Sequence, residues 1–226
     1  MMDARSTDLF ETSEALAVAQ ARQMAEQLFD GEPGSHDWEH TLRVYRLCRD
    51  LGPQEGVDMA VLSVAAFLHD VGRCHQDASH GAVCHAAQGA AMAADLVAGL
   101  PLTEAQTTNV VHCVRAHRFR KEPHPATVEA RVLFDADKLD AIGAVGIARA
   151  YQFAGEVGAR LHNPNHDVSN TRAYSREDTG YREYRVKLRH IKDRMLTEAG
   201  RRVAEGRHRF MTLFFERFLE EVEGHL

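Results

Sequence analysis

Apolar residues recur at intervals of three and four along most of the chain, which is the spacing of one face of an α-helix. No segment shows the sustained alternation that half-buried β-strands require. In the first helix we expect Ala15, Val18, Met24, Ala25 and Leu28 to face the core. The pattern predicts an all-α protein. Two helices are expected to begin at caps: one runs from Ser35 or Asp37 to about 51, and one runs from a capping box of Thr103 and Gln106 through His117. The other helices are expected over about 13–28, 57–69, 85–98, 127–155 and 181–222.

Two polar stretches interrupt this pattern. Residues 72–83 are rich in Gly, His, Asp and Ser, and residues 160–179 predict a long loop that is either mobile or a lid. A length of 226 residues suits one hydrophobic core. We therefore expect a single domain over 1–226, with its core at about 20–155 and terminal helices at about 181–222.

Composition limits the classes of partner. The 27 basic and 33 acidic residues give a net charge of -6, so neither nucleic acid nor an anionic membrane is favoured. No apolar stretch approaches the roughly 20 residues of a membrane span, and no basic segment precedes a hydrophobic one at the N-terminus. Four scattered cysteines without a CxxC pair indicate free thiols in a reducing compartment. These features predict a cytoplasmic protein with a small-molecule partner.

The strongest chemical signal is the pair His69 and Asp70, which ends the apolar run 61–68. Burying an imidazole and a carboxylate there is costly unless both find partners, and a divalent cation satisfies both. His40 and Asp137 are further candidate ligands. Two imidazoles and two carboxylates suit Mn, Fe, Co, Ni, Zn or, less naturally, Mg.

The order His40, His69-Asp70, Asp137 resembles the HD superfamily of metal-dependent phosphohydrolases. Within it, the segments 35–44, 135–143 and 187–211 are similar to the bacterial subfamily of YpgQ and YedJ type. This resemblance spans nearly the whole chain. It implies a helical HD-domain bundle, nucleotide pyrophosphohydrolase activity and a divalent ion, with Mn favoured, held by His40, His69, Asp70 and Asp137.

Some ligand assignments stay open at this stage. Asp135 lies about 200° around the helix from Asp137, so one ion would not use both, and the resemblance favours Asp137. Asp140 is either a hydrogen-bond partner of a ligand or a solvated carboxylate. A second metal is also considered, with His85 and either His112 or His117 as ligands.

A phosphohydrolase also needs cations for its substrate. We expect Asp70 to orient the attacking water, Arg73 and Lys138 to assist catalysis, and His36, Arg43, Arg118 and Lys187 to bind substrate. Some HD nucleotidases carry a glutamate at the position of Arg73, so the resemblance weakens a phosphomonoesterase assignment. Trp38 would either stack on a base or pack in the core.

The favoured function is therefore hydrolysis of (deoxy)nucleoside triphosphates to monophosphate and pyrophosphate by a metal-activated water. The alternatives are an HD-type phosphomonoesterase or phosphodiesterase acting on another nucleotide, and a non-catalytic nucleotide sensor. A di-iron oxygenase is more remote. Aromatic residues at helical spacing over 210–218 predict that the last helix packs on the core or on a second subunit, which leaves a homodimer open.

Overall fold

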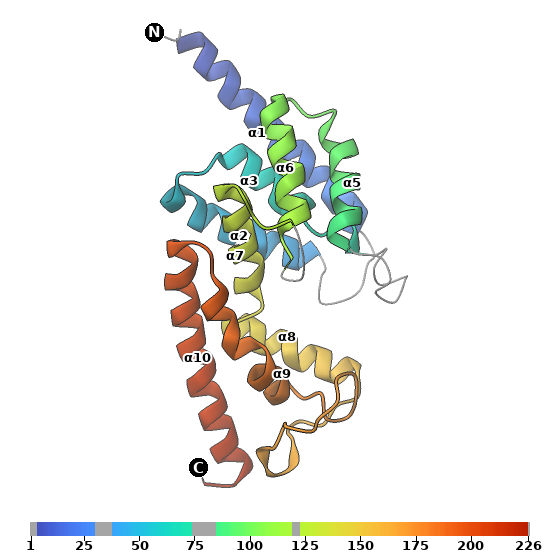
Figure 1. Ribbon diagram of the computed structural model, residues 1–226, viewed down its shortest axis with the longest axis vertical. Helices are drawn as coiled ribbons and strands as arrows, with labels where there is room; N and C mark the ends of the chain where they lie inside the picture. Colours follow the sequence, from blue (N-terminus) through green and yellow to red (C-terminus); the bar gives the residue numbers. More distant parts are fainter. Residues whose placement is uncertain (1–3, 30–37, 74–84, 119–122, 226) are drawn as a thin grey trace. The chain divides into compact units, whose positions relative to one another are not determined.

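The computed structural model describes residues 4–29, 38–73, 85–118 and 123–225, and the regular elements within these ranges are helices (Figure 1). The expected all-α class is confirmed. The chain divides into two compact units, 1–136 and 137–226. Among the described helices, none combines the length and the apolar character that crossing a bilayer requires.

Helix α3 (Met59–Leu68) forms the centre of the first unit, and its residues from Ala60 to Leu68 are all buried. It packs against α1, α2 and α6, while α5 lies along α6. The helices of this unit are α1 (Ala4–Phe29), α2 (Trp38–Glu55), α3, α5 (His85–Val97), α6 (Glu104–Ala116) and most of α7 (Val128–Asp140) (Figure 1). The capping box predicted for α6 is confirmed.

Local sequence explains where α3 begins and ends. The Asp58 carboxylate accepts hydrogen bonds from the backbone N–H groups of Ala60 and Val61, which caps the helix. Near the other end, the Phe67 ring stacks on Tyr45 at 4.4 Å and on Trp38 at 6.0 Å between ring centroids. Of the two interpretations of Trp38, the structure shows packing against Phe67. The C-terminal cap of α3 is His69.

The buried face of α1 differs from the prediction. Its buried positions are Ala17, Ala21, Ala25 and Phe29, spaced by four residues, whereas Leu28 is 43% exposed. Of the five residues expected to face inward, only Ala25 is buried. The larger Val, Met and Leu side chains dominated the hydrophobic pattern, but the small alanines are what allow α1 to approach α3 closely.

The single helix predicted over 127–155 is wrong, because the chain breaks into α7 and α8 (Gly143–Glu156). Gly143 adopts a φ of 78°, a conformation that glycine tolerates and other residues rarely adopt. Ile142 before it has extended backbone, so α8 starts in a new direction. The Arg207 guanidinium donates to the Leu139 carbonyl and satisfies one acceptor in the last turn of α7.

In the second unit, α8 packs against α9 (Gly180–Val186) and α10 (Glu198–Val222). The short 3-10 helix η2 (Leu188–Arg194) connects α9 to α10, so the helical stretch predicted over 181–222 is divided into three elements. Helix α10 buries Met211 and Phe215, and the Phe215 ring stacks on Tyr184 at 4.4 Å. Met211 and Phe215 of the face predicted over 210–218 therefore pack within their own unit, whereas Phe210 is 48% exposed.

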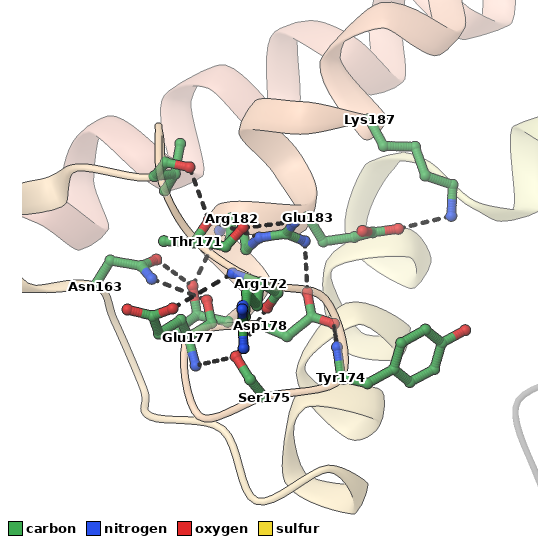
Figure 2. A network of polar contacts seen from close by, with 12 residues as sticks. Asn163, Thr171, Arg172, Tyr174, Ser175, Glu177, Asp178, Arg182, Glu183 and Lys187 are labelled. Carbon is green, nitrogen blue, oxygen red and sulfur yellow. Dashed lines mark hydrogen bonds and ion pairs between the residues drawn. The ribbon is translucent and has the colours of Figure 1, made fainter.

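Polar contacts fix the long loop over 160–179, which contains the short 3-10 helix η1 (Pro164–His166). Figure 2 shows Asp178 accepting from the Tyr174 backbone N–H at 2.7 Å and pairing with Arg182 of α9 at 2.8 Å. Arg182 Nε donates to the Thr171 hydroxyl at 2.7 Å. These contacts also hold Tyr174 at a φ of 56°, which is strained for a non-glycine residue. The loop is anchored on α9, and its role as a lid stays a prediction.

Candidate metal centre

Helix ends in the first unit bring five buried ligand-type side chains together. His40 lies in the first turn of α2, His69 caps the C-terminus of α3, and Asp70 follows it. His85 is the first residue of α5, and His117 caps the C-terminus of α6. All five are at most 5% exposed. Burying five polar side chains together is costly unless each has a hydrogen-bond partner or binds a metal ion.

The first group of ligand atoms surrounds one oxygen of Asp70. His40 Nε2 and His69 Nε2 lie 3.3 Å apart, and Asp70 Oδ2 lies 3.8 Å from each of them. His69 Nδ1 donates to the Ala66 carbonyl at 2.8 Å, so the Nε2 of a neutral ring carries a lone pair. Asp137, the fourth candidate ligand, lies on α7 and is the first residue of the second unit.

This arrangement fits a divalent ion. A point equidistant from three atoms separated by 3.3, 3.8 and 3.8 Å lies about 2.1 Å from each, a normal distance from a transition metal to imidazole nitrogen or carboxylate oxygen. Two nitrogens and carboxylate oxygens form a donor set suited to Mn, Fe, Co, Ni or Zn. The structure therefore brings His40, His69 and Asp70 together where a divalent ion fits, and the assignment of His40, His69, Asp70 and Asp137 as its ligands stays a prediction.

A second group forms around the other oxygen of Asp70. Asp70 Oδ1 lies 3.4 Å from His85 Nε2 and 3.4 Å from His117 Nε2, and these two nitrogens lie 3.1 Å apart. His117 Nδ1 donates to the Val114 carbonyl at 2.6 Å. Of the two alternatives that the sequence left open, the structure brings His117 to this group, while His112 accepts a hydrogen bond from the Ala126 backbone N–H.

Electrostatics place positive charge beside the second group. Burial lowers the pKa of His85 to about 3, Asp70 opposes this shift, and the charges of His117, Arg118 and Arg73 add to it. The His85 ring is therefore neutral at physiological pH, as a metal ligand must be. Arg73 and Arg118, two of the predicted catalytic and substrate-binding cations, thus act electrostatically on the His85 ring.

The other predicted phosphate contacts lie in varied surroundings. Lys138 forms an ion pair with Asp137, and Lys187 pairs with Glu183 at 2.6 Å on an exposed part of α9 (Figure 2). Arg43 is half-buried on α2. His36 lies outside the described residues.

The other two aspartates of the segment 135–143, Asp135 and Asp140, are both buried. Asp135 is fully buried and does not belong to either candidate metal group among the described residues. Asp140 is also buried and accepts a hydrogen bond from Arg149 at 2.6 Å. Its interpretation as a solvated carboxylate is therefore wrong, because Arg149 neutralises it inside the second unit.

Comparison with known proteins identifies the family. Residues 37–142 match the HD domain, and this span contains all the candidate ligands described above. One relative, described in the next paragraph, is 30% identical to this chain over 210 residues, which are 91% of the chain. The protein belongs to the HD superfamily and is a metal-dependent phosphohydrolase.

The relative is YpgQ of Bacillus subtilis strain 168, described as uncharacterized, of which the match covers 93%. A crystal structure of B. subtilis YpgQ in complex with ADP superposes with a TM-score of 0.69 at 30% identity, covering 90% of this chain and 96% of YpgQ. An HD-superfamily hydrolase from Bacillus thuringiensis superposes with a TM-score of 0.73 at 27% identity, covering 93% and 98% of the two chains.

Proposed function

We propose that the protein is a nucleotide pyrophosphohydrolase that cleaves (deoxy)nucleoside triphosphates to the monophosphate and pyrophosphate. The observation that carries this proposal is the buried cluster of His40, His69 and Asp70 with two arginines beside it. That cluster combines a candidate metal centre with charges suited to a polyphosphate. We expect a transition metal, with Mn favoured, because Mn²⁺ accepts imidazole ligands more readily than Mg²⁺ does.

A divalent ion bound by His40, His69, Asp70 and Asp137 lowers the pKa of a bound water and neutralises charge on a phosphoryl oxygen. The Asp70 carboxylate can accept a hydrogen bond from the attacking water and direct it to the α-phosphorus. Arg73 and Arg118 then neutralise the charge that develops on the leaving pyrophosphate. Lys138 would act from beside Asp137.

Two observations favour a nucleotide with a phosphate chain. YpgQ, which resembles this chain over most of its length, has been crystallised with ADP. Arg73 stands where an acid-base glutamate would serve a phosphomonoesterase, and a cation at that position suits the higher charge of a triphosphate. His36, Arg43 and Lys187 are proposed as additional phosphate contacts.

The test is a product analysis across nucleotides and metals. Nucleoside and deoxynucleoside triphosphates, monophosphates and cyclic nucleotides are incubated with Mn, Co, Ni or Mg, and pyrophosphate is resolved from orthophosphate by ³¹P NMR. We expect metal-dependent release of pyrophosphate from triphosphates. Release of orthophosphate from monophosphates, or opening of a cyclic nucleotide, would replace the proposal by another phosphoesterase, and binding without turnover would indicate a sensor.

A matched pair of variants connects the activity to the cluster. Asp70→Asn removes the charge of the shared carboxylate with little change in shape, and we expect a loss greater than the roughly 10- to 100-fold that loss of an outer hydrogen-bond partner costs. Asp95→Asn makes the same chemical change on the exposed surface of α5 and should retain activity. Equal activity of the two variants would exclude the cluster as the catalytic centre.

A further inference from the structure

We propose that the outer face of α10 is an interface at which two copies of the protein pair, with their α10 helices antiparallel. This inference goes beyond the proposed function and does not depend on it, because α10 contains none of the candidate metal ligands named above. It rests on two observations within the second unit. One is an apolar face that the unit leaves exposed, and the other is the order of charges along the helix.

Two large apolar side chains lie on this outer face. Phe210 is 48% exposed and Leu213 is 66% exposed, and a spacing of three residues puts them on the same side of the helix. Met211 and Phe215, which pack inside the unit, lie about 150° around the helix from them. Phe210 and Leu213 therefore lie outside the core of their unit, and contact with a second helix would remove them from water.

The charges of α10 are divided between its two halves. Residues 198–209 contain four arginines and two glutamates, whereas residues 210–223 contain four glutamates and one arginine. The helix dipole favours acidic residues near the N-terminus and basic residues near the C-terminus. Beyond Glu198 in the first turn, α10 has the opposite order, and its last turn has no basic residue. The stability of α10 alone does not explain this order, which suits a partner whose charges run in the reverse direction.

A second copy of α10 that runs antiparallel is such a partner. A two-fold axis near the middle of the helix, between Phe210 and Leu213, brings Phe210 of each copy against Leu213 of the other. The same axis places the basic half of each helix beside the acidic half of the other copy. Such an interface is self-complementary, as two-fold symmetry requires.

The edge of the apolar face shows the complementarity residue by residue. Arg202 and Arg209 are exposed along one edge, and Glu216 and Glu220 are exposed along the continuation of that edge. Arg202 also pairs with Glu198 within its own helix. In an antiparallel pair this edge lies on the same side of both helices, so the two arginines of one copy lie opposite the two glutamates of the other. A parallel pair would place like charges opposite each other, which disfavours that orientation.

Sedimentation velocity of the full chain, from about micromolar to submillimolar concentration, tests the interface. We expect an equilibrium between monomer and dimer. Leu213→Glu places a charge on the apolar face of both copies and should raise the dissociation constant at least about tenfold. Leu161→Glu is the matched control, because it makes the same change at another exposed leucine of the second unit and should leave the dissociation constant unchanged.

Charge reversal tests the antiparallel order. Arg202→Glu with Arg209→Glu makes the edge wholly acidic, and Glu216→Arg with Glu220→Arg makes it wholly basic. Each double variant should associate more weakly than the unmodified protein, and an equimolar mixture of the two should form heterodimers, which native mass spectrometry counts. Undiminished association of both double variants would overturn the antiparallel order.

Two further outcomes would contradict the interface itself. A monomer at every concentration of the unmodified protein overturns the pairing of two copies and would assign the outer face of α10 to a different partner. A dimer that Leu213→Glu weakens no more than Leu161→Glu does overturns the location. Circular dichroism checks the fold of each variant, and sedimentation of the unmodified protein decides the first question even if a variant fails to fold.

Discussion

Replacing Gly143 by alanine tests the helix break between α7 and α8. The residue has a φ of 78°, and a left-handed conformation costs a residue with a Cβ about 1–2 kcal/mol. An added Cβ would also lie 3.0 Å from Arg207 Cγ and 3.1 Å from its Cβ. The Arg207 stem would have to shift, and its hydrogen bond to the Leu139 carbonyl would weaken. We expect a total loss of about 2 kcal/mol.

Gly206 provides the matched control. It lies in the middle of α10, and an added Cβ there meets no atom within 4 Å. Because alanine is the better helix former, Gly206→Ala should raise the free energy of unfolding by about 1 kcal/mol. The same substitution thus changes stability in opposite directions at the two positions. Urea unfolding followed by circular dichroism, in EDTA so that bound metal adds nothing, measures both. A Gly143→Ala variant as stable as Gly206→Ala would refute the strained break.

Three further predictions concern the capping box, a buried thiol and the long loop. Thr103→Ala should cost about 1 kcal/mol in urea unfolding, and Thr103→Ser should restore it, because a hydroxyl there accepts the Gln106 backbone N–H. Burial raises the pKa of Cys113 to about 12 from 9.0, so at pH 8.5 the folded chain has a lower fraction of thiolate at Cys113 than the unfolded chain. Peptide mass spectrometry should therefore find that Cys113 is alkylated about a thousandfold more slowly in the folded than in the unfolded chain. This protection, and the stability linked to it, diminishes as the pH rises from 9 toward 12. Asp178→Ala removes the partner of Arg182 and of the Tyr174 N–H, so trypsin should cleave within 160–179 faster than in the unmodified protein, and an unchanged rate would contradict the anchoring role.

Much of the first unit could be predicted because its strongest signals are local. The apolar run of α3 and the polar pair that ends it are adjacent in sequence, and the capping box at Thr103 is contained in four residues. Hydrophobic spacing was less informative for α1, where the buried stripe consists of alanines whose hydropathy is weak. The hydrogen bond from Arg207 to the Leu139 carbonyl at the end of α7 joins residues more than sixty positions apart, and such contacts leave no local pattern.

The candidate site shows the same division. His40, His69 and Asp137 were recognisable from their order along the chain, and within the first unit the structure gathers the ligand atoms of His40, His69 and Asp70. The arrangement of Asp70 between two histidine pairs was not predicted, because the pairing of His85 with His117 depends on how α5 and α6 lie against each other. The choice between His112 and His117 likewise required knowing which one ends its helix.

The most direct test of the central claim is hydrolysis of a deoxynucleoside triphosphate in H₂¹⁸O with Mn²⁺, followed by mass spectrometry of both products. Water directed by Asp70 to the α-phosphorus must leave its oxygen on the nucleoside monophosphate. We therefore predict ¹⁸O in the monophosphate and unlabelled pyrophosphate. Label in the pyrophosphate, or labelled orthophosphate as the product, would contradict the account.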